Sequence, residues 1–278
     1  MSALQVSAQQ SHIFRAAMDA LEAAGIPYSV GGGLALYVHT GIRRQVHDFD
    51  IHVVPGDIEP AMEALRSAGF KSWVQFPQWL AQAERNGVQV DMVFGQGSWH
   101  ASADQGWIEG GPRAEVLDHE VNVIPAEELI WSKGMRCSRF RYDASDVFHL
   151  FAALADRLDW PHLIERFGED WEVLLSHLLM FRYVFPRDAQ RVPRSVWDQL
   201  LGGLATDLDR SGLEPLVCRG ALLDSADPYD QYFYERGYRD EREERWQQRL
   251  RAETDELEPL VEQDVHDAGA PGGIRAAS

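Results

Sequence analysis

Two carboxylates, Asp48 and Asp50, stand one residue apart in a short apolar segment of the sequence. Successive side chains of a β-strand point to opposite faces, so Asp48, Asp50 and His52 would share one face. The other face would carry apolar residues that suit a core, namely Phe49, Ile51 and Val53. Two carboxylates held side by side repel each other unless a cation lies between them. Because oxygen ligands favour a hard ion, the segment predicts a site for Mg²⁺ or Mn²⁺.

A glycine turn precedes this segment and predicts a place for phosphate. Residues 28–30 read as a short strand that ends at Gly31, Gly32 and Gly33. Glycine lets the backbone turn tightly and approach a ligand closely. A helix over 34–39 would then direct its free N–H groups at whatever lies above the turn, which favours phosphate.

A third carboxylate lies on the strand that follows the Asn86-Gly87 dipeptide, which is a strong hairpin signal. In the segment 88–94 every second residue is apolar, and Asp91 stands on the opposite face. An acidic residue in the middle of so apolar a strand needs solvent or a partner. Two interpretations stay open: Asp91 faces solvent on an edge strand, or it is a third ligand beside the first two carboxylates.

The first half of the chain supplies the elements that must position these groups. Helical spacing of apolar residues predicts helices over 11–24 and 55–69, and alternation predicts strands over 70–76 and 79–85. Two further segments complete this half: a surface loop and a single additional strand, expected over 96–112 and 114–124.

The second half has helical periodicity from Pro125 onward. Helices are predicted over 126–137, 143–155, 160–167, 170–185 and 196–208, with aromatic residues at helical spacing expected in the core (Trp171, Phe181, Tyr183 and Trp197). The fold class is therefore α+β, a mixed β-sheet core with flanking helices followed by an all-α part. We expect an α/β core over 1–124, a helical domain over 125–236, and a charged helix with a disordered tail over 237–278.

Composition excludes several classes of function. The net charge of −18 argues against a general electrostatic grip on nucleic acid. No apolar run is long enough to span a membrane, and the N-terminus lacks the pattern of a secretory signal. The two cysteines, Cys137 and Cys218, have no metal-ligand spacing and are too few for a disulfide framework, so we expect a cytoplasmic protein.

The order of these motifs resembles the nucleotidyltransferase superfamily with the polymerase-beta-type fold. The matching motif is a glycine pair (Gly31-Gly32), a short helix, an Asp-x-Asp strand (Asp48 and Asp50) and a later Asp on another strand (Asp91). The helical part resembles the branch that includes minimal nucleotidyltransferases and the toxins of bacterial abortive-infection systems. Four residues carry that second likeness: Lys133, Arg136, Asp143 and Asp146.

The resemblance implies an enzyme that moves an NMP from an NTP to an acceptor hydroxyl in a cleft between the two parts. Asp48, Asp50 and Asp91 would hold Mg²⁺ or Mn²⁺ and act as the catalytic residues. The nucleotide would be bound by Gly31, Gly32, Gly33, Arg44, Lys133 and Arg136. The acceptor stays open between a tRNA, a protein and a small aminoglycoside-like molecule. A basic cleft that could receive a nucleic acid would involve Arg43, Arg44, Lys133, Arg136, Arg139 and Arg141.

Two alternatives to this enzyme remain. Many members of the superfamily have Ser or Thr after the glycine pair and in the run before the first Asp, where this chain has Gly33 and Val46. Those differences favour an inert relative that binds nucleotide or a protein partner, as in a toxin–antitoxin pair. The second alternative is a metal-dependent hydrolase built on Asp48, Asp50 and His52, for which zinc would suit the histidine.

Several of these residues also have a purely structural interpretation. His52 would equally be an exposed polar residue, and Lys133 with Arg136 would equally form a solvated stripe of a helix. Asp143 and Asp146, close to a helix start, would favour the helix dipole.

Overall fold

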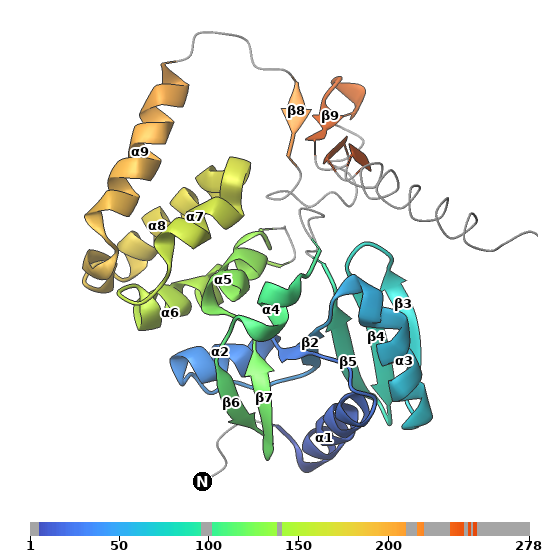
Figure 1. The fold of residues 1–278 in the computed structure, drawn as a ribbon. Coiled ribbons are helices and arrows are strands. Elements are labelled where there is room, and N and C mark those ends of the chain that lie inside the picture. Colours follow the sequence, from blue (N-terminus) through green and yellow to red (C-terminus); the bar gives the residue numbers. More distant parts are fainter. Residues whose placement is uncertain are drawn as a thin grey trace, which may run out of the picture.

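Seven strands form one mixed β-sheet in the part of the chain that the computed structural model describes, residues 6–95, 102–137, 141–209, 216–219, 234–241, 244–245 and 247–248 (Figure 1). The strands are β1 Ser29–Val30, β2 Phe49–His52, β3 Lys71–Phe76, β4 Leu80–Arg85, β5 Val88–Val93, β6 Arg113–Val116 and β7 His119–Val123. Their order across the sheet is β3-β4-β5-β2-β1-β7-β6. The pairs β1–β7 and β2–β5 are parallel, and the other neighbours are antiparallel.

The helices follow the expected order. They are α1 Ala8–Ala23, α2 Gly32–Thr40, α3 Ile58–Ser67, α4 Gln105–Glu109, α5 Ala126–Gly134, α6 Ala144–Leu154, α7 Trp160–Phe167, α8 Trp171–Val184 and α9 Arg194–Leu208. Short 3₁₀ turns lie at η1 Pro55–Asp57, η2 Gly168–Asp170 and η3 Asp188–Arg191. Two short strands, β8 Val217–Cys218 and β9 Arg239–Asp240, pair with each other apart from the main sheet. The predicted α+β class, a mixed sheet followed by helices, is confirmed.

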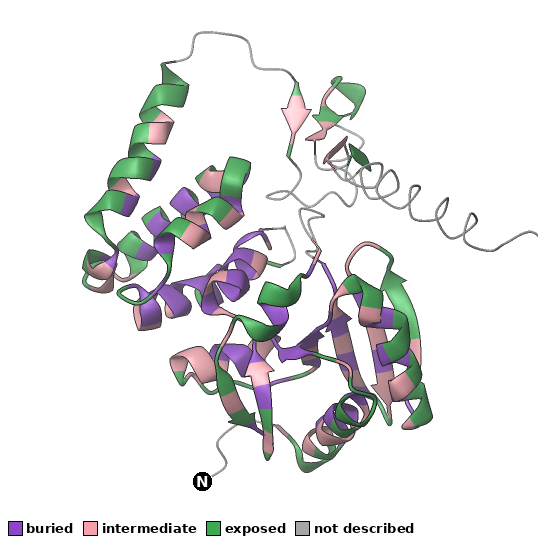
Figure 2. Cartoon of the chain, viewed as in Figure 1, coloured by how far each residue is buried: buried purple, intermediate pink, exposed green. Residues whose placement is uncertain are grey.

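The apolar face of the central strands is buried as the alternation predicts. Phe49 and Ile51 of β2 are fully buried, and the ring of Phe49 stacks on Phe14 of α1 with centroids 5.0 Å apart. In Figure 2 the buried residues run through the middle strands and the facing sides of the helices. The opposite face of β2 and β5, which carries the carboxylates, is therefore turned away from α1.

Two predictions about the first half were wrong. The segment expected as a surface loop contains α4, whose Trp107 is fully buried; residues 96–101 of that segment lie outside the described residues. The single strand expected over 114–124 is the hairpin of β6 and β7. The chain reverses at Leu117 and Asp118, both of which have positive φ.

The helical part packs α5, α6, α7 and α8 against one another, with α2 contacting α5 and α6. The core placement of Phe181 is confirmed, and Trp171 and Trp197 are partly buried against the core. Tyr183 is 82% exposed, so its assignment to the core was wrong. No helix among the described residues is long and apolar enough to cross a membrane. The division into three domains stays a prediction, and most of 237–278 lies outside the described residues.

Candidate active site

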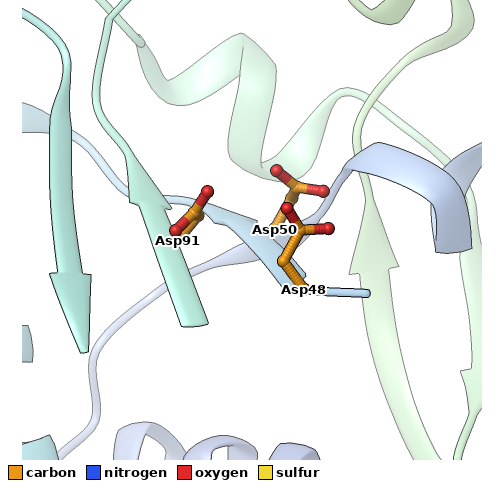
Figure 3. A group of neighbouring side chains, drawn as sticks. All are labelled: Asp48, Asp50 and Asp91. Carbon is orange, nitrogen blue, oxygen red and sulfur yellow. The ribbon is translucent and has the colours of Figure 1, made fainter. Parts of the chain in front are cut away.

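Three carboxylates meet on one face of the sheet because of the register between two parallel strands. Asp50 of β2 is the direct neighbour of Asp91 of β5, and Asp48 comes just before β2. One oxygen from each of the three lies within 4.8 Å of the other two (Figure 3). β5 lies between β4 and β2, so the interpretation of Asp91 as a residue of an edge strand was wrong.

The three carboxylates are in an unfavourable electrostatic environment. Burial, followed by the charges of Asp48 and Asp91, raises the pKa of Asp50 to about 7. Burial also raises the pKa of Asp91, although its Oδ1 accepts hydrogen bonds from the Nε2 of Gln89 at 2.5 Å and of Gln82 at 3.0 Å. Clustered carboxylates of this kind favour the binding of a cation.

The glycine turn is shaped by the strand beside it. A Cβ on Gly32, whose φ is +54°, would lie 1.7 Å from Asp50 Oδ2, and one on Gly31 would lie 2.3 Å from the His52 ring. Both positions therefore require glycine so that β2 side chains can approach the backbone. A Cβ on Gly33 would meet its nearest atom only at 3.5 Å, so that position has room for a side chain.

His52 takes no part in the carboxylate cluster. It is buried, not exposed, and its ring contacts that of Trp107 edge to face at a centroid distance of 5.3 Å. Burial, and then the charge of Lys133, lowers the pKa of His52 to about 3. Among the described residues the cluster able to hold a metal ion contains the three aspartates alone, which removes the structural basis for the zinc hydrolase.

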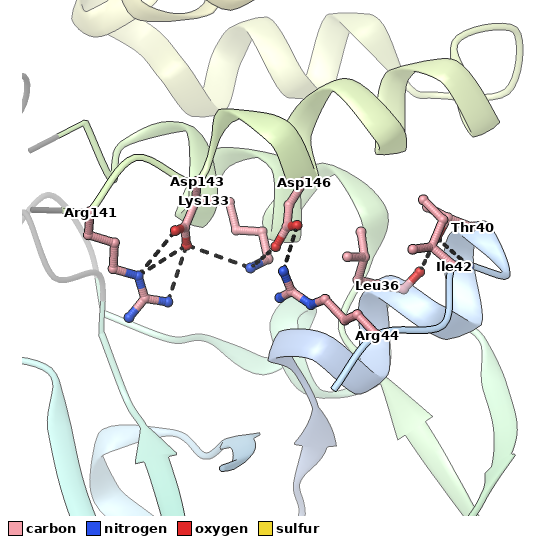
Figure 4. Close-up of polar contacts among 8 residues, drawn as sticks. All are labelled: Leu36, Thr40, Ile42, Arg44, Lys133, Arg141, Asp143 and Asp146. Carbon is pink, nitrogen blue, oxygen red and sulfur yellow. Dashed lines mark hydrogen bonds and ion pairs between the residues drawn. The ribbon is translucent and has the colours of Figure 1, made fainter. Parts of the chain in front are cut away.

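A network of ion pairs joins the helical part to the turn between α2 and β2 (Figure 4). Asp146, in the first turn of α6, contacts Arg44 Nη1 at 2.9 Å and Lys133 Nζ at 2.8 Å. Asp143 lies 3.7 Å from the same Nζ and 3.2 Å from Arg141 Nε. Lys133 is buried, so its placement on a solvated stripe was wrong. The acids do lie at the helix start as expected, but their ion pairs were not predicted.

One pocket of about 880 Å³ collects these groups from both halves of the chain. Its lining includes Gly32, Gly33, Arg44, Asp48, Asp50 and Asp91 from the first half, and Leu129, Ser132, Lys133, Arg136, Arg141 and Asp143 from the second. The predicted catalytic, metal-binding and nucleotide-binding residues all line this pocket except Gly31. Of the expected basic cleft, Arg43 does not line it, and Arg139 lies outside the described residues.

Aromatic residues of the pocket were not anticipated. The guanidinium of Arg136 lies 4.6 Å from the ring centroid of Trp79, and that ring stacks on Phe76 with centroids 5.4 Å apart. Burial, and then the charge of Arg141, lowers the pKa of Arg136. Gln82 and Gln89, which hold Asp91, were also missed, although strand alternation places Gln89 on the Asp91 face.

Comparison with known proteins gives one family match. A family model described as aminoglycoside-2''-adenylyltransferase matches residues 13–149, a little under half of the chain. That range contains the three carboxylates, the glycine turn and the ion-pair network. No curated protein sequence matches the chain.

Solved structures provide likenesses of the fold. The antibiotic-resistance factor ANT(2'')-Ia is similar over 72% of this chain and 97% of its own, with 16% identity and a TM-score of 0.39. A nucleotidyltransferase-like antigen of Paracoccidioides brasiliensis is similar over 67% and 95%, with 15% identity and a TM-score of 0.46. The lincosamide adenylyltransferase LnuA with bound lincomycin is similar over 54% and 99%, with 16% identity and a TM-score of 0.39.

The family match gives no support to a toxin–antitoxin partner, because it is to an adenylyltransferase family. Four observations together identify the superfamily: the Asp-x-Asp strand, the third Asp on its parallel neighbour, the glycine turn and the family match. Residues 13–149 belong to the nucleotidyltransferase superfamily, which makes the protein a nucleotidyltransferase.

Proposed function

We propose that this enzyme transfers an NMP, with ATP as the donor, to a hydroxyl of a small aminoglycoside-like acceptor. The observation that carries the proposal is the meeting of Asp48, Asp50 and Asp91 within 4.8 Å on one wall of a pocket of about 880 Å³. ATP and a small-molecule acceptor are supported by the family description, which names an aminoglycoside adenylyltransferase.

Nucleotidyltransferases of this family use divalent metal ions, and the residues present suit one. The three carboxylates offer oxygen donors alone, and burial together with the charges of Asp48 and Asp91 raises the pKa of Asp50. Asp48, Asp50 and Asp91 would therefore hold Mg²⁺ or Mn²⁺. When bound, such ions neutralise the charge of the triphosphate and of the departing pyrophosphate.

The protein's own groups would bind and orient the substrates. The start of α2 presents N–H groups of the glycine turn to phosphate oxygens. Arg44, Lys133 and Arg141 line the pocket and pair with Asp143 and Asp146, so three cations meet two helix acids and would contact phosphate once metal ions offset the three strand carboxylates. Asp91 would accept the proton of the acceptor hydroxyl as its oxygen bonds to the α-phosphorus and pyrophosphate leaves.

Isothermal titration of ATP with Mg²⁺, Mn²⁺ or EDTA, together with an assay of pyrophosphate release, tests the proposal. Asp50→Asn should weaken metal-dependent ATP binding at least about tenfold and lower turnover by about 10³-fold or more. Asp118→Asn is the matched control, because Asp118 lies in the β6–β7 turn and pairs with Arg15 instead. Unchanged turnover in Asp50→Asn would refute the assignment of the site.

The inert relative predicts nucleotide binding without pyrophosphate release. No observation favours the inert relative over the enzyme. The pocket keeps all three carboxylates, and the glycine at position 33 leaves free space there without blocking the pocket. A nucleic-acid acceptor and a cytoplasmic location stay predictions from the sequence.

A further inference from the structure

Three planar groups, those of Phe76, Trp79 and Arg136, lie next to one another in the lining of the pocket. The rings of Phe76 and Trp79 are nearly parallel, with 7° between their planes, and the guanidinium of Arg136 covers the Trp79 ring. Phe76 is 45% exposed and Trp79 is partly exposed, although both are large and apolar. A single exposed aromatic residue is common, whereas an aligned set of planar groups lining a pocket offers a surface for another flat group.

The order of the strands places this stack on one side of the carboxylates. Trp79 directly precedes β4, and β4 pairs with β5, which carries Asp91. The glycine turn follows β1, which pairs with β2 on the other side. Across the sheet the glycine turn and the aromatic stack are thus separated by Asp50 and Asp91.

The stack is also held in place before any ligand binds. Phe76 and Trp79 come from the β3–β4 hairpin, where Trp79 N–H donates to the Phe76 carbonyl at 3.1 Å. Arg136 follows α5 in the helical part, so its contact with Trp79 joins the two halves of the pocket. A preformed surface costs less ordering of side chains when a ligand binds.

We propose that Phe76, Trp79 and Arg136 form the acceptor subsite, and that the acceptor carries a ring whose flat face stacks on it. This inference rests on the proposed function, in which phosphate lies at the glycine turn and the acceptor hydroxyl at Asp91. The ring is either aromatic or the C–H face of a sugar, since both stack on indole and phenyl faces. Its hydroxyl oxygen forms the new bond to the α-phosphorus, the bond to the β-phosphate oxygen breaks, and Asp91 takes the proton.

The test compares Trp79→Ala and Phe76→Ala with two matched variants. Trp79→Phe keeps a ring in the stack, and Trp73→Ala removes a similarly exposed tryptophan of the same hairpin that does not line the pocket. Both alanine variants of the stack should raise the KM for the acceptor about tenfold, with kcat and the Kd of Mg–ATP within about twofold of wild type. Trp79→Phe should recover most of the acceptor affinity that Trp79→Ala loses, and Trp73→Ala should behave as wild type.

Four acceptors distinguish the possible sources of the ring. Tobramycin and lincomycin supply sugar rings, 2-phenylethanol supplies an aromatic ring and a hydroxyl without a sugar, and glycerol has hydroxyls without a ring. Turnover with 2-phenylethanol alone assigns an aromatic acceptor, and turnover with either antibiotic assigns a sugar. Turnover with glycerol alone, or equal acceptor KM values in Trp79→Ala and Trp73→Ala, overturns the proposal.

The remaining outcomes separate this inference from the proposed function. Protein that binds Mg–ATP but uses none of the ring compounds contradicts the subsite alone. Protein that fails to bind Mg–ATP contradicts the proposed function. In that case direct titration of the ring compounds into nucleotide-free protein still decides: binding lost in Trp79→Ala supports the subsite, and no binding overturns it.

Discussion

Two groups of carboxylates belong to the same site, and the protein treats them in opposite ways. Asp143 and Asp146 at the start of α6 are paired with cations from three segments of the chain (Figure 4). Asp50 and Asp91 on the strands, with Asp48 just before β2, lie close together (Figure 3) and have no ion pair with any described residue. The pKa of Asp50 is raised by burial and by the charges of the other two.

The difference shows which charges the fold satisfies by itself. Removing one partner of a buried ion pair leaves the other charge buried and unpaired, which strongly destabilises the folded chain. A carboxylate cluster without cations opposes folding slightly and is stabilised only when a cation binds. The paired acids Asp143 and Asp146 therefore hold the pocket's cations in place, whereas the strand carboxylates are available to bind a ligand cation. Removing one carboxylate from each group should change stability in opposite directions.

The largest effect is expected at Asp146. Asp146→Ala leaves Lys133 buried beside Asp143 at 3.7 Å as its nearest carboxylate, so the free energy of unfolding should fall by about 3 kcal/mol. Urea denaturation with and without the substitution measures it. Asp198→Asn, which breaks an exposed ion pair with Arg194, should cost less than about 1 kcal/mol. Equal losses of unfolding free energy in the two variants would show that the buried ion-pair network contributes no more to stability than an exposed ion pair.

A smaller effect of opposite sign is expected at Asp50 in metal-free protein. The folded-state pKa of about 7 lies above the ordinary value of 3.8, so the folded chain holds more protons between those two values. The free energy of unfolding of wild type should therefore fall as pH rises from about 4 to 7. Asp50→Asn should lack this fall and be more stable at pH 8 by on the order of 1 kcal/mol.

Thermal melts across this pH range in EDTA measure both effects. Adding Mg²⁺ or Mn²⁺ should then raise the melting temperature of wild type and leave that of Asp50→Asn nearly unchanged. If metal-free Asp50→Asn were less stable than wild type at pH 8, the Asp50 carboxylate would stabilise the fold. The strand carboxylates would then not differ from Asp143 and Asp146 in the way argued above.

The strand side of the site could be predicted from the sequence because the relevant rules are local. A period of two places Asp48 and Asp50 on one face, and the apolar alternation around Asp91 marks it as exceptional. The helix side could not, because the Arg44–Asp146 contact spans 102 residues and depends on how the helices pack.

The missed hairpin and the missed α4 have local causes of their own. The β6–β7 turn uses Leu117 and Asp118 at positive φ, without the glycine or proline that marks most turns. The Gly-rich surroundings of Trp107 indicated a loop and concealed a short helix capped by Asp104, whose side chain accepts from the Trp107 N–H.

The smallest effect is expected at Gly33, where sequence and structure can be compared directly. Many superfamily members have a hydroxyl residue here, and the open space around Gly33 shows that its absence is not required by packing. Gly33→Ser should change the free energy of unfolding by less than about 0.5 kcal/mol, because φ is ordinary and the nearest atom to the new Cβ lies at 3.5 Å. Gly33→Ser, which adds a hydroxyl at the start of α2, should bind Mg–ATP about threefold more tightly than Gly33→Ala does, as measured by titration. Tighter binding in the serine variant alone would show that the strand side of the pocket receives phosphate, and unchanged binding in both variants would place the triphosphate elsewhere.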